Sequence, residues 1–191
     1  MRGKRPLSER QVKSLRKLVE GNELHELLLN LSVDLMLRGG DLLRLRVSDV
    51  LTESGTVKSE VKIKQQKTKK TTLSIPLSKN SINVIKKYIV GRDMDDFVFR
   101  SQFSHFTNKP LSIFQYSRIV KKWMGEHLGL DDVSSFSTHS LRKTKSSVIY
   151  QKTQSVEIVR RLLGQSSVTA TSAYLGIEDS DALEVARTIN I

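Results

Sequence analysis

Apolar residues recur at helical spacing along most of the chain. Ser8 followed by Gln11 forms a capping-box pair ahead of an apolar face, which predicts a first helix from about Glu9 to Glu20, ending near Gly21-Asn22. Residues 24–37 are apolar almost all round, which predicts a second helix buried at the centre of the molecule. Further helices are predicted over residues 41–45, 78–90, 112–128, 140–151, 156–163 and 179–189.

The period changes to two between Thr56 and Pro76. Apolar and polar residues alternate on both sides of the polar stretch 65–70, which is typical of two antiparallel strands joined by a longer loop. No internal repeat or low-complexity linker divides the chain. The pattern therefore predicts a single domain over residues 1–191 that is mainly α with a small antiparallel β-sheet, an α+β fold.

Charge is the most informative part of the composition. The chain has 191 residues, with 32 Lys and Arg against 20 Asp and Glu, a net charge of +12 and a pI near 10.0. Such a basic domain is a candidate for binding nucleic acid, and an aromatic content of only 6% favours contacts to duplex phosphates over stacking on single strands. The apolar stretch at 24–37 is too short and too polar for a membrane span, and the N-terminus lacks a signal-peptide pattern. We therefore expect a cytoplasmic protein with no membrane partner.

The usual motifs for metal or nucleotide chemistry are missing. The chain has no cysteine, its four histidines are scattered, and no HExxH or GxxxxGK[ST] pattern occurs. The sequence therefore predicts no metal site and no cofactor, and Gly39-Gly40 is interpreted as a structural junction. Phosphate chemistry that relies on cationic side chains remains open.

Five short sequence segments follow one another in a characteristic order. They are LRGGDLL at 37–43 with LRVSDV at 45–50, QQKTK at 65–69, SIPL at 74–77, HSLR at 139–142, and LLGQSS at 162–167 followed by Tyr174. Together they resemble the signatures of the tyrosine recombinase (phage integrase) family. The resemblance spans Arg38 to Tyr174 and implies the fold of that family's catalytic domain over essentially the whole chain. The family's separate N-terminal core-binding domain is not expected within these residues.

The resemblance implies a chemical role for each matched side chain. Tyr174 would attack the scissile phosphate and form a 3′-phosphotyrosyl link, while Arg38 and Arg142 hold the non-bridging oxygens, because guanidinium groups match phosphate geometry. His139 would exchange protons at the phosphate, and Lys67 would protonate the leaving 5′-oxygen.

Other matched or basic residues have supporting roles. Asp41 is expected to orient an arginine or a histidine. Lys64, Lys69, Lys70 and Lys143 are expected to bind DNA.

Without the resemblance, plainer interpretations are available for the same residues. Tyr174 has the surroundings of an ordinary half-buried tyrosine, and His139 those of a histidine at the start of a helix. Lys67 is one of several lysines on the hairpin, which together suit a basic strip that grips phosphates.

Gln165 departs from the family pattern, which usually has histidine or tryptophan at this position. Its amide can donate a hydrogen bond to a phosphate oxygen but carries neither a proton for transfer nor a positive charge. We therefore expect it to contribute to the site as an uncharged donor.

The function implied by the resemblance is site-specific recombination or integration of duplex DNA, without metal or ATP. Two alternatives are a catalytically weakened DNA-binding regulator with the same fold and a type IB topoisomerase-like enzyme. The resemblance also implies a homo-oligomer on DNA, a tetramer assembled through residues 179–191, in a bacterial or phage-encoded protein associated with the nucleoid.

Overall fold

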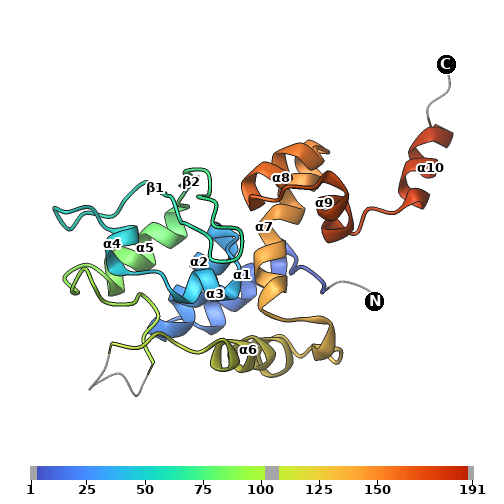
Figure 1. The fold of residues 1–191 in the computed structure, drawn as a ribbon. Helices are drawn as coiled ribbons and strands as arrows, with labels where there is room; N and C mark the ends of the chain where they lie inside the picture. Colours follow the sequence, from blue (N-terminus) through green and yellow to red (C-terminus); the bar gives the residue numbers. More distant parts are fainter. Residues whose placement is uncertain (1–3, 102–107, 189–191) are drawn as a thin grey trace.

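The computed structural model describes residues 4–101 and 108–188, and it is mainly helical (Figure 1). The helices are α1 (Glu9–Leu18), α2 (Glu23–Leu35), α3 (Gly39–Leu43), α4 (Val47–Val50), α5 (Lys79–Tyr88), α6 (Ile113–Lys122), α7 (Thr138–Thr153), α8 (Val156–Leu163), α9 (Val168–Leu175) and α10 (Asp179–Thr188). A π-helical turn, Trp123–His127, continues α6, and a 3₁₀ turn covers Val133–Ser135. Strands β1 (Glu60–Val61) and β2 (Ile75–Pro76) pair antiparallel. The predicted fold class is confirmed.

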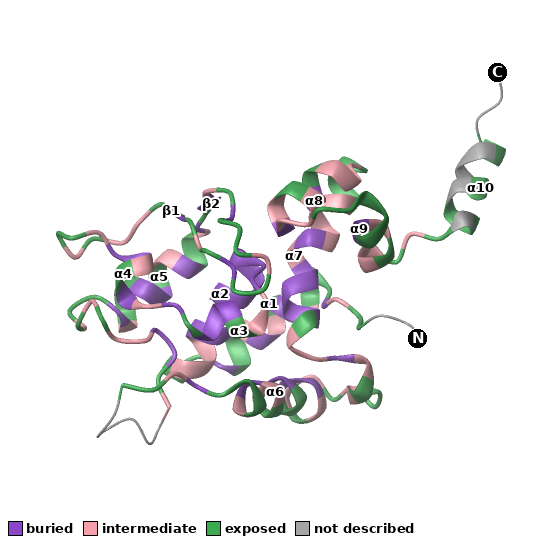
Figure 2. Ribbon diagram, viewed as in Figure 1, coloured by how far each residue is buried: buried purple, intermediate pink, exposed green. Residues whose placement is uncertain are grey.

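Helix α2 lies at the centre of the main core, as its all-round apolar character predicts. Every residue from Leu27 to Leu35 is buried (Figure 2), and both α5 and α7 pack against this helix. Asp34 accepts hydrogen bonds from Nζ of Lys145 in α7 at 2.5 Å and from the backbone N–H of Ser78, the N-cap of α5, at 2.6 Å. Because a buried carboxylate is costly unless it is paired, this side chain fixes the position of both neighbouring helices.

A sharp corner joins α2 to α3. Helix α2 ends at Leu35 because Met36, its C-cap, adopts a left-handed conformation with φ of 51°. Arg38 is then the N-cap of α3, which begins at Gly39, two residues earlier than predicted. A Cβ at Gly39 would lie 2.6 Å from Cδ1 of Ile113 in α6, so this glycine permits close packing of the corner on α6. The glycine pair is the structural junction that the sequence predicts.

The chain between β1 and β2 forms a long hairpin, in agreement with the period of two. Val61 faces Ile75, and farther along the hairpin a bridge joins Lys64 to Thr71. The turn at 65–70 extends away from α4 and α5 toward α7 (Figure 1). The regular strands are only two residues long, because the rest of the hairpin is held by isolated bridges and side-chain contacts.

Helices α8 and α9 pack at one end of α7 around a second apolar cluster. Met36, Val159 and Leu163 are buried in this cluster, and Tyr174 packs against it. The sequence analysis predicts α8 with its bounds but misses α9. The VTATSAYL segment of α9 is rich in β-branched and polar residues and has no clear apolar stripe, so its helical signal is weak.

Helix α10 stands apart from the other helices after a short connection at 176–178 (Figure 1). Leu183 on this helix is 56% exposed. The predicted helix over 179–189 agrees with α10 up to Thr188, and residues 189–191 of the predicted oligomerisation segment lie outside the described residues. Within 4–101 and 108–188, no helix is long and apolar enough to cross a membrane.

Candidate active site

Two arginines that are distant in the sequence are connected to one backbone carbonyl group, one directly and one through a glutamine. Arg142, in α7, is 2% exposed, and its Nη2 donates a hydrogen bond to the carbonyl of Leu163 at 3.2 Å. Arg38 donates from Nη1 to Oε1 of Gln65 at 2.8 Å, and Nε2 of Gln65 donates to the same Leu163 carbonyl at 3.3 Å. The structure therefore brings together the two arginines that the sequence analysis selects.

Tyr174 lies in the last turn of α9, which packs against α7. Its hydroxyl is buried close to the Arg142 guanidinium and the Ser146 hydroxyl but makes a hydrogen bond of ordinary geometry with neither, and Nη1 of Arg142 is buried without such a bond as well. Burial raises the pKa of Tyr174, while the charge and proximity of Arg142, the nearby Ser146 hydroxyl and, more weakly, the charge of Arg38 act in the opposite direction. Since buried polar groups normally have partners, these two unpaired groups are suited to an anionic ligand that accepts hydrogen bonds from both.

The other tyrosines that could replace Tyr174 as a nucleophile are placed differently. Tyr116 is 1% exposed in the main core, and burial strongly raises the pKa of its hydroxyl. Tyr150 belongs to α7 and packs against the same apolar cluster as Tyr174.

His139 lies in the first turn of α7, on an exposed part of the helix and within electrostatic reach of both arginines. Partial burial lowers the pKa of His139, and the charges of Arg142 and Arg38 lower it further. The N-terminal end of a helix also disfavours a cation. The imidazole is therefore mainly neutral at pH 7, a state in which it can accept a proton.

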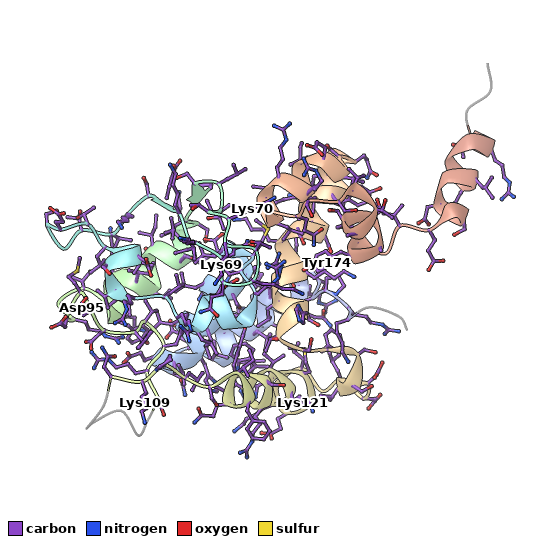
Figure 3. The ribbon with its side chains drawn as sticks, in the orientation of Figure 1. Lys69, Lys70, Asp95, Lys109, Lys121 and Tyr174 are labelled. Carbon is purple, nitrogen blue, oxygen red and sulfur yellow. The ribbon has the colours of Figure 1, made fainter. Side chains whose placement is uncertain are left out.

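Lys67 lies at the exposed tip of the hairpin turn, with Lys69 and Lys70 following it. Figure 3 shows Tyr174 beside α7 and α9, with Lys69 and Lys70 on the turn that extends toward α7. Lys64 is also exposed, at the base of this turn. These lysines form a basic edge beside the arginine pair.

Asp41 holds the hairpin rather than an arginine or a histidine. It is 5% exposed, and its Oδ1 accepts a hydrogen bond from the backbone N–H of Gln66 at 2.8 Å, while Oδ2 is buried and unpaired. Its charge nevertheless reaches Arg142, whose pKa it helps to keep high against the lowering effect of burial. Asp41 therefore contacts the hairpin through a direct hydrogen bond, and it acts on Arg142 only through its charge.

Gln165 lies in the turn between α8 and α9, directly after Gly164, the left-handed C-cap of α8. Its Oε1 accepts a hydrogen bond of 2.6 Å from Oγ1 of Thr171, which is fully buried. Because the amide oxygen accepts this hydrogen bond, the NH₂ group is the part of the Gln165 side chain that can donate to a ligand. Gln165 thus lies just beyond the helix predicted over 156–163, and its contact with a phosphate stays a prediction.

Lys143, which the sequence analysis expects to bind DNA together with the hairpin lysines, does not lie exposed beside them. It is 8% exposed, and its Nζ lies 5.5 Å from the centre of the Tyr174 ring. Burial lowers the pKa of Lys143. A cation over an aromatic ring attracts the ring electrostatically and favours the anionic form of a phenol. Its position therefore suits an effect on Tyr174 better than a direct grip on DNA.

Sequence reasoning missed the importance of Gln65. It quotes this residue as part of the hairpin segment but assigns it no role, although the side chain contacts Arg38 and the end of α8. The only available signal is a glutamine two positions before the matched lysine, which indicates nothing without the tertiary structure. Among the residues described, no group of three or more His, Asp or Glu side chains is arranged to hold a metal ion.

The chain is similar to known proteins in its sequence and in its fold. The family model described as "Phage integrase family" matches residues 5–180. The chain is 29% identical over 178 residues to the "Probable integrase/recombinase YoeC" of Bacillus subtilis (strain 168), covering 88% of this chain and 91% of that protein. It is also 29% identical over 175 residues to a "Tyrosine recombinase" of Pseudothermotoga lettingae, covering 89% of this chain but only 56% of that one.

Solved structures of recombinases share this fold, and two of them illustrate the likeness. The XerA recombinase superposes with a TM-score of 0.73 at 19% identity, covering 96% of this chain and 64% of the other. The XerH site-specific recombinase, bound to its difH substrate in a pre-cleavage complex, superposes with a TM-score of 0.70 at 18% identity, covering 95% of this chain and 53% of the other. At this level of identity, the likeness establishes the fold.

Proposed function

Because this chain belongs to the phage integrase family, whose model covers residues 5–180, we propose that it cleaves and rejoins duplex DNA through a 3′-phosphotyrosyl intermediate on Tyr174. The observation that carries the proposal is that the hydroxyl of Tyr174 is buried next to the Arg142 guanidinium, with neither that hydroxyl nor Nη1 of Arg142 in a hydrogen bond of ordinary geometry. A phosphodiester between these groups satisfies the arginine and places phosphorus within reach of the hydroxyl. The family membership and this pair of atoms support the same reaction from independent directions.

In the proposed reaction, Oη of Tyr174 attacks phosphorus and the bond from phosphorus to the 5′-oxygen breaks. The phenolic proton passes to the neutral imidazole of His139, and the Lys67 ammonium donates a proton to the departing 5′-oxygen. Arg38 and Arg142 hold the non-bridging oxygens and stabilise the extra negative charge of the transition state.

Rejoining is the same step in reverse, with a 5′-hydroxyl attacking the phosphotyrosine and the tyrosine leaving. The bond energy is conserved in the intermediate, so the proposed mechanism needs neither metal nor ATP.

Duplex DNA is the substrate that the charge distribution favours. Lys64, Lys69 and Lys70 lie exposed on the hairpin, and the chain carries a net charge of +12. The proposal treats residues 1–191 as one catalytic domain that acts on DNA in the cytoplasm, in association with the nucleoid. Helix α10, which stands apart from the other helices in Figure 1 and exposes Leu183, is proposed to dock on a neighbouring copy in a tetramer.

The test uses a pool of duplexes with a randomised central sequence and a nick that traps the covalent intermediate. The full chain is incubated with this pool, protein–DNA adducts that survive denaturation are recovered, and their DNA is sequenced. We expect adducts enriched in one sequence, formed equally well in EDTA and absent with Tyr174→Phe, which still binds the duplex. An adduct that persists in Tyr174→Phe would assign the nucleophile to another tyrosine, first of all Tyr150.

The two alternatives predict different results in the same experiment. A DNA-binding regulator binds a defined duplex sequence without forming any adduct, and this outcome is linked to the uncharged Gln165 in the site. A type IB topoisomerase-like enzyme forms adducts and relaxes supercoiled plasmid as a monomer. A recombinase instead joins strands from two recovered target sites, which is detected as exchanged products.

A further inference from the structure

The turn of the hairpin contains one buried side chain among exposed ones. Gln66, Lys67, Lys69 and Lys70 are exposed, whereas Gln65 is only 2% exposed. A buried amide is costly unless its polar atoms are paired, so its partners define what this part of the hairpin is attached to.

The partners of Gln65 belong to the site described above. Its Oε1 accepts from Nη1 of Arg38 at 2.8 Å and from Oγ1 of Thr68 at 2.9 Å, while its Nε2 donates to the carbonyl of Leu163 at 3.3 Å. That carbonyl also accepts from Arg142. One amide group thus connects an arginine, the hairpin turn next to Lys67, and the helix end that holds the second arginine.

The backbone near Gln65 is shaped to receive this amide. Gly164, at φ of 63°, follows Leu163, and a Cβ added at this glycine would lie 3.3 Å from Nε2 of Gln65. The absence of a side chain at Gly164 therefore allows the amide to lie close against the end of α8. The next residue along the chain is Gln165.

An amide suits this position better than a carboxylate. The position requires an acceptor toward Arg38 and a donor toward the Leu163 carbonyl, and a glutamine side chain supplies both. A glutamate would pair with Arg38, compensating the charge that a phosphate needs, and it would repel the carbonyl oxygen.

We propose that Gln65 is a positioning residue whose amide docks the hairpin turn on the arginine pair, so that Lys67 reaches the leaving 5′-oxygen only while Arg38 and the 163–165 turn are held in place. The inference rests on the proposed function and deepens it. Its specific content is that loss of the amide impairs proton donation by Lys67, and not merely the fold or DNA binding.

The test compares Gln65→Met, which keeps the shape of the side chain but removes its hydrogen bonds, with Gln151→Met, the same change at an exposed position of α7. Adduct formation is measured on the recovered target sequence with a normal 5′-oxygen and with a 5′-bridging sulfur, which leaves without a proton. We expect Gln65→Met to cleave normal DNA about 10- to 10³-fold more slowly, a part of the about 10²- to 10⁴-fold that a well-positioned proton donor contributes. On the sulfur substrate we expect most of this defect to disappear, and Gln151→Met to match the wild type on both.

Three further measurements separate positioning from other effects. Adding Gln65→Met to Lys67→Ala should slow cleavage of normal DNA little beyond Lys67→Ala alone, since both remove the same function. Duplex affinity and the thermal midpoint should stay close to those of Gln151→Met. Gln65→Glu should instead give a defect that the sulfur substrate does not rescue, because the added carboxylate compensates the positive charge of Arg38 that binds phosphate.

Two outcomes overturn the inference while leaving the proposed function intact. If Gln65→Met cleaves normal DNA at the wild-type rate, the Gln65 amide does not position Lys67 for catalysis. If its defect is equal on oxygen and sulfur substrates, it acts on phosphate binding and not on Lys67.

Docking of the hairpin is also tested without chemistry, by limited trypsin digestion of the folded full chain. We expect Gln65→Met to speed cleavage after Lys67, Lys69 and Lys70 relative to Gln151→Met, and equal rates refute docking. If the wild type forms no adduct at all, the proposed function fails and the catalytic part of this inference fails with it, whereas docking is still decided by the digestion.

Discussion

The position of Lys143 leads to a prediction about the nucleophile itself. Its Nζ lies 5.5 Å from the centre of the Tyr174 ring, and the residue is 8% exposed, so water screens this charge poorly. With an effective dielectric constant of about 20, a full negative charge at 5.5 Å is stabilised by about 3 kcal/mol. The charge that develops in the transition state is partial and centred on the oxygen beyond the ring, which reduces the effect to about 1–2 kcal/mol. This corresponds to a factor of about 5–30 in rate.

We therefore expect Lys143→Met to slow formation of the Tyr174 adduct about 5- to 30-fold at pH 7, while Lys143→Arg, which keeps the charge, stays near the wild type. The assay is single-turnover adduct formation on the nicked target duplex between pH 6 and pH 9.5. The defect of Lys143→Met should shrink toward the alkaline end of this range, because burial lowers the pKa of Lys143 and the wild type then loses the same charge. Lys13→Met, which removes an exposed charge on α1, is the matched control.

Two results would refute this reasoning. A Lys143→Met defect that stays constant up to the alkaline end of the range would mean that the charge of the Lys143 ammonium is not its cause. An unchanged cleavage rate combined with weaker, less salt-dependent DNA binding would restore the DNA-binding role that the sequence analysis predicts for this lysine.

Further predictions concern the uncharged donor, the buried ion pair and the salt dependence. Gln165→Ala should slow cleavage about 10- to 10³-fold, the range for one lost transition-state donor, whereas Gln165→His should keep or raise the rate; equal rates in both would place this residue outside the reacting site. Thr171→Val, which frees the amide of Gln165, should give a smaller defect of the same kind in the same assay. Burial raises the pKa of Asp34, but the pairing with Lys145 and the other hydrogen bonds to its carboxylate outweigh it, and the net pKa is lowered. The stability that this ion pair contributes is therefore present above the pKa of Asp34 in the unfolded chain. It is lost as the pH falls through the lower pKa of the folded state. Urea unfolding should therefore show Lys145→Met destabilised by about 2–4 kcal/mol at pH 7 and by less in strong acid; an equal loss at both would exclude the ion pair as its cause. Duplex affinity should fall with salt by about 0.9 in log K per unit of log salt for each phosphate contact, and a flat response would exclude a phosphate footprint.

Periodicity was sufficient to identify most of the helices and the hairpin, because their signals are local. Helix α8 begins and ends at the residues that the pattern predicts, since its Ser155 cap and its left-handed Gly164 are encoded within a few positions. Helix ends set by packing were less predictable. The pattern continues helix α2 to residue 37, but the left-handed Met36 ends it at Leu35 and turns the chain so that Arg38 caps the next helix.

The amino-acid sequence by itself determined the family, the basic charge and the order of the residues proposed for the chemistry, because these depend on residue types and their spacing along the chain. Only the tertiary structure decided what those residues contact. Lys143 follows Arg142 directly, and in the sequence it is indistinguishable from a DNA-binding lysine. In the structure, its position on α7 places its ammonium over the Tyr174 ring. Gln65 has no distinguishing feature in the sequence, yet it joins Arg38 to Leu163, a residue 98 positions farther along the chain. Contacts across such separations follow from the packing of α7 and α8 against the hairpin, which no local pattern of residues encodes.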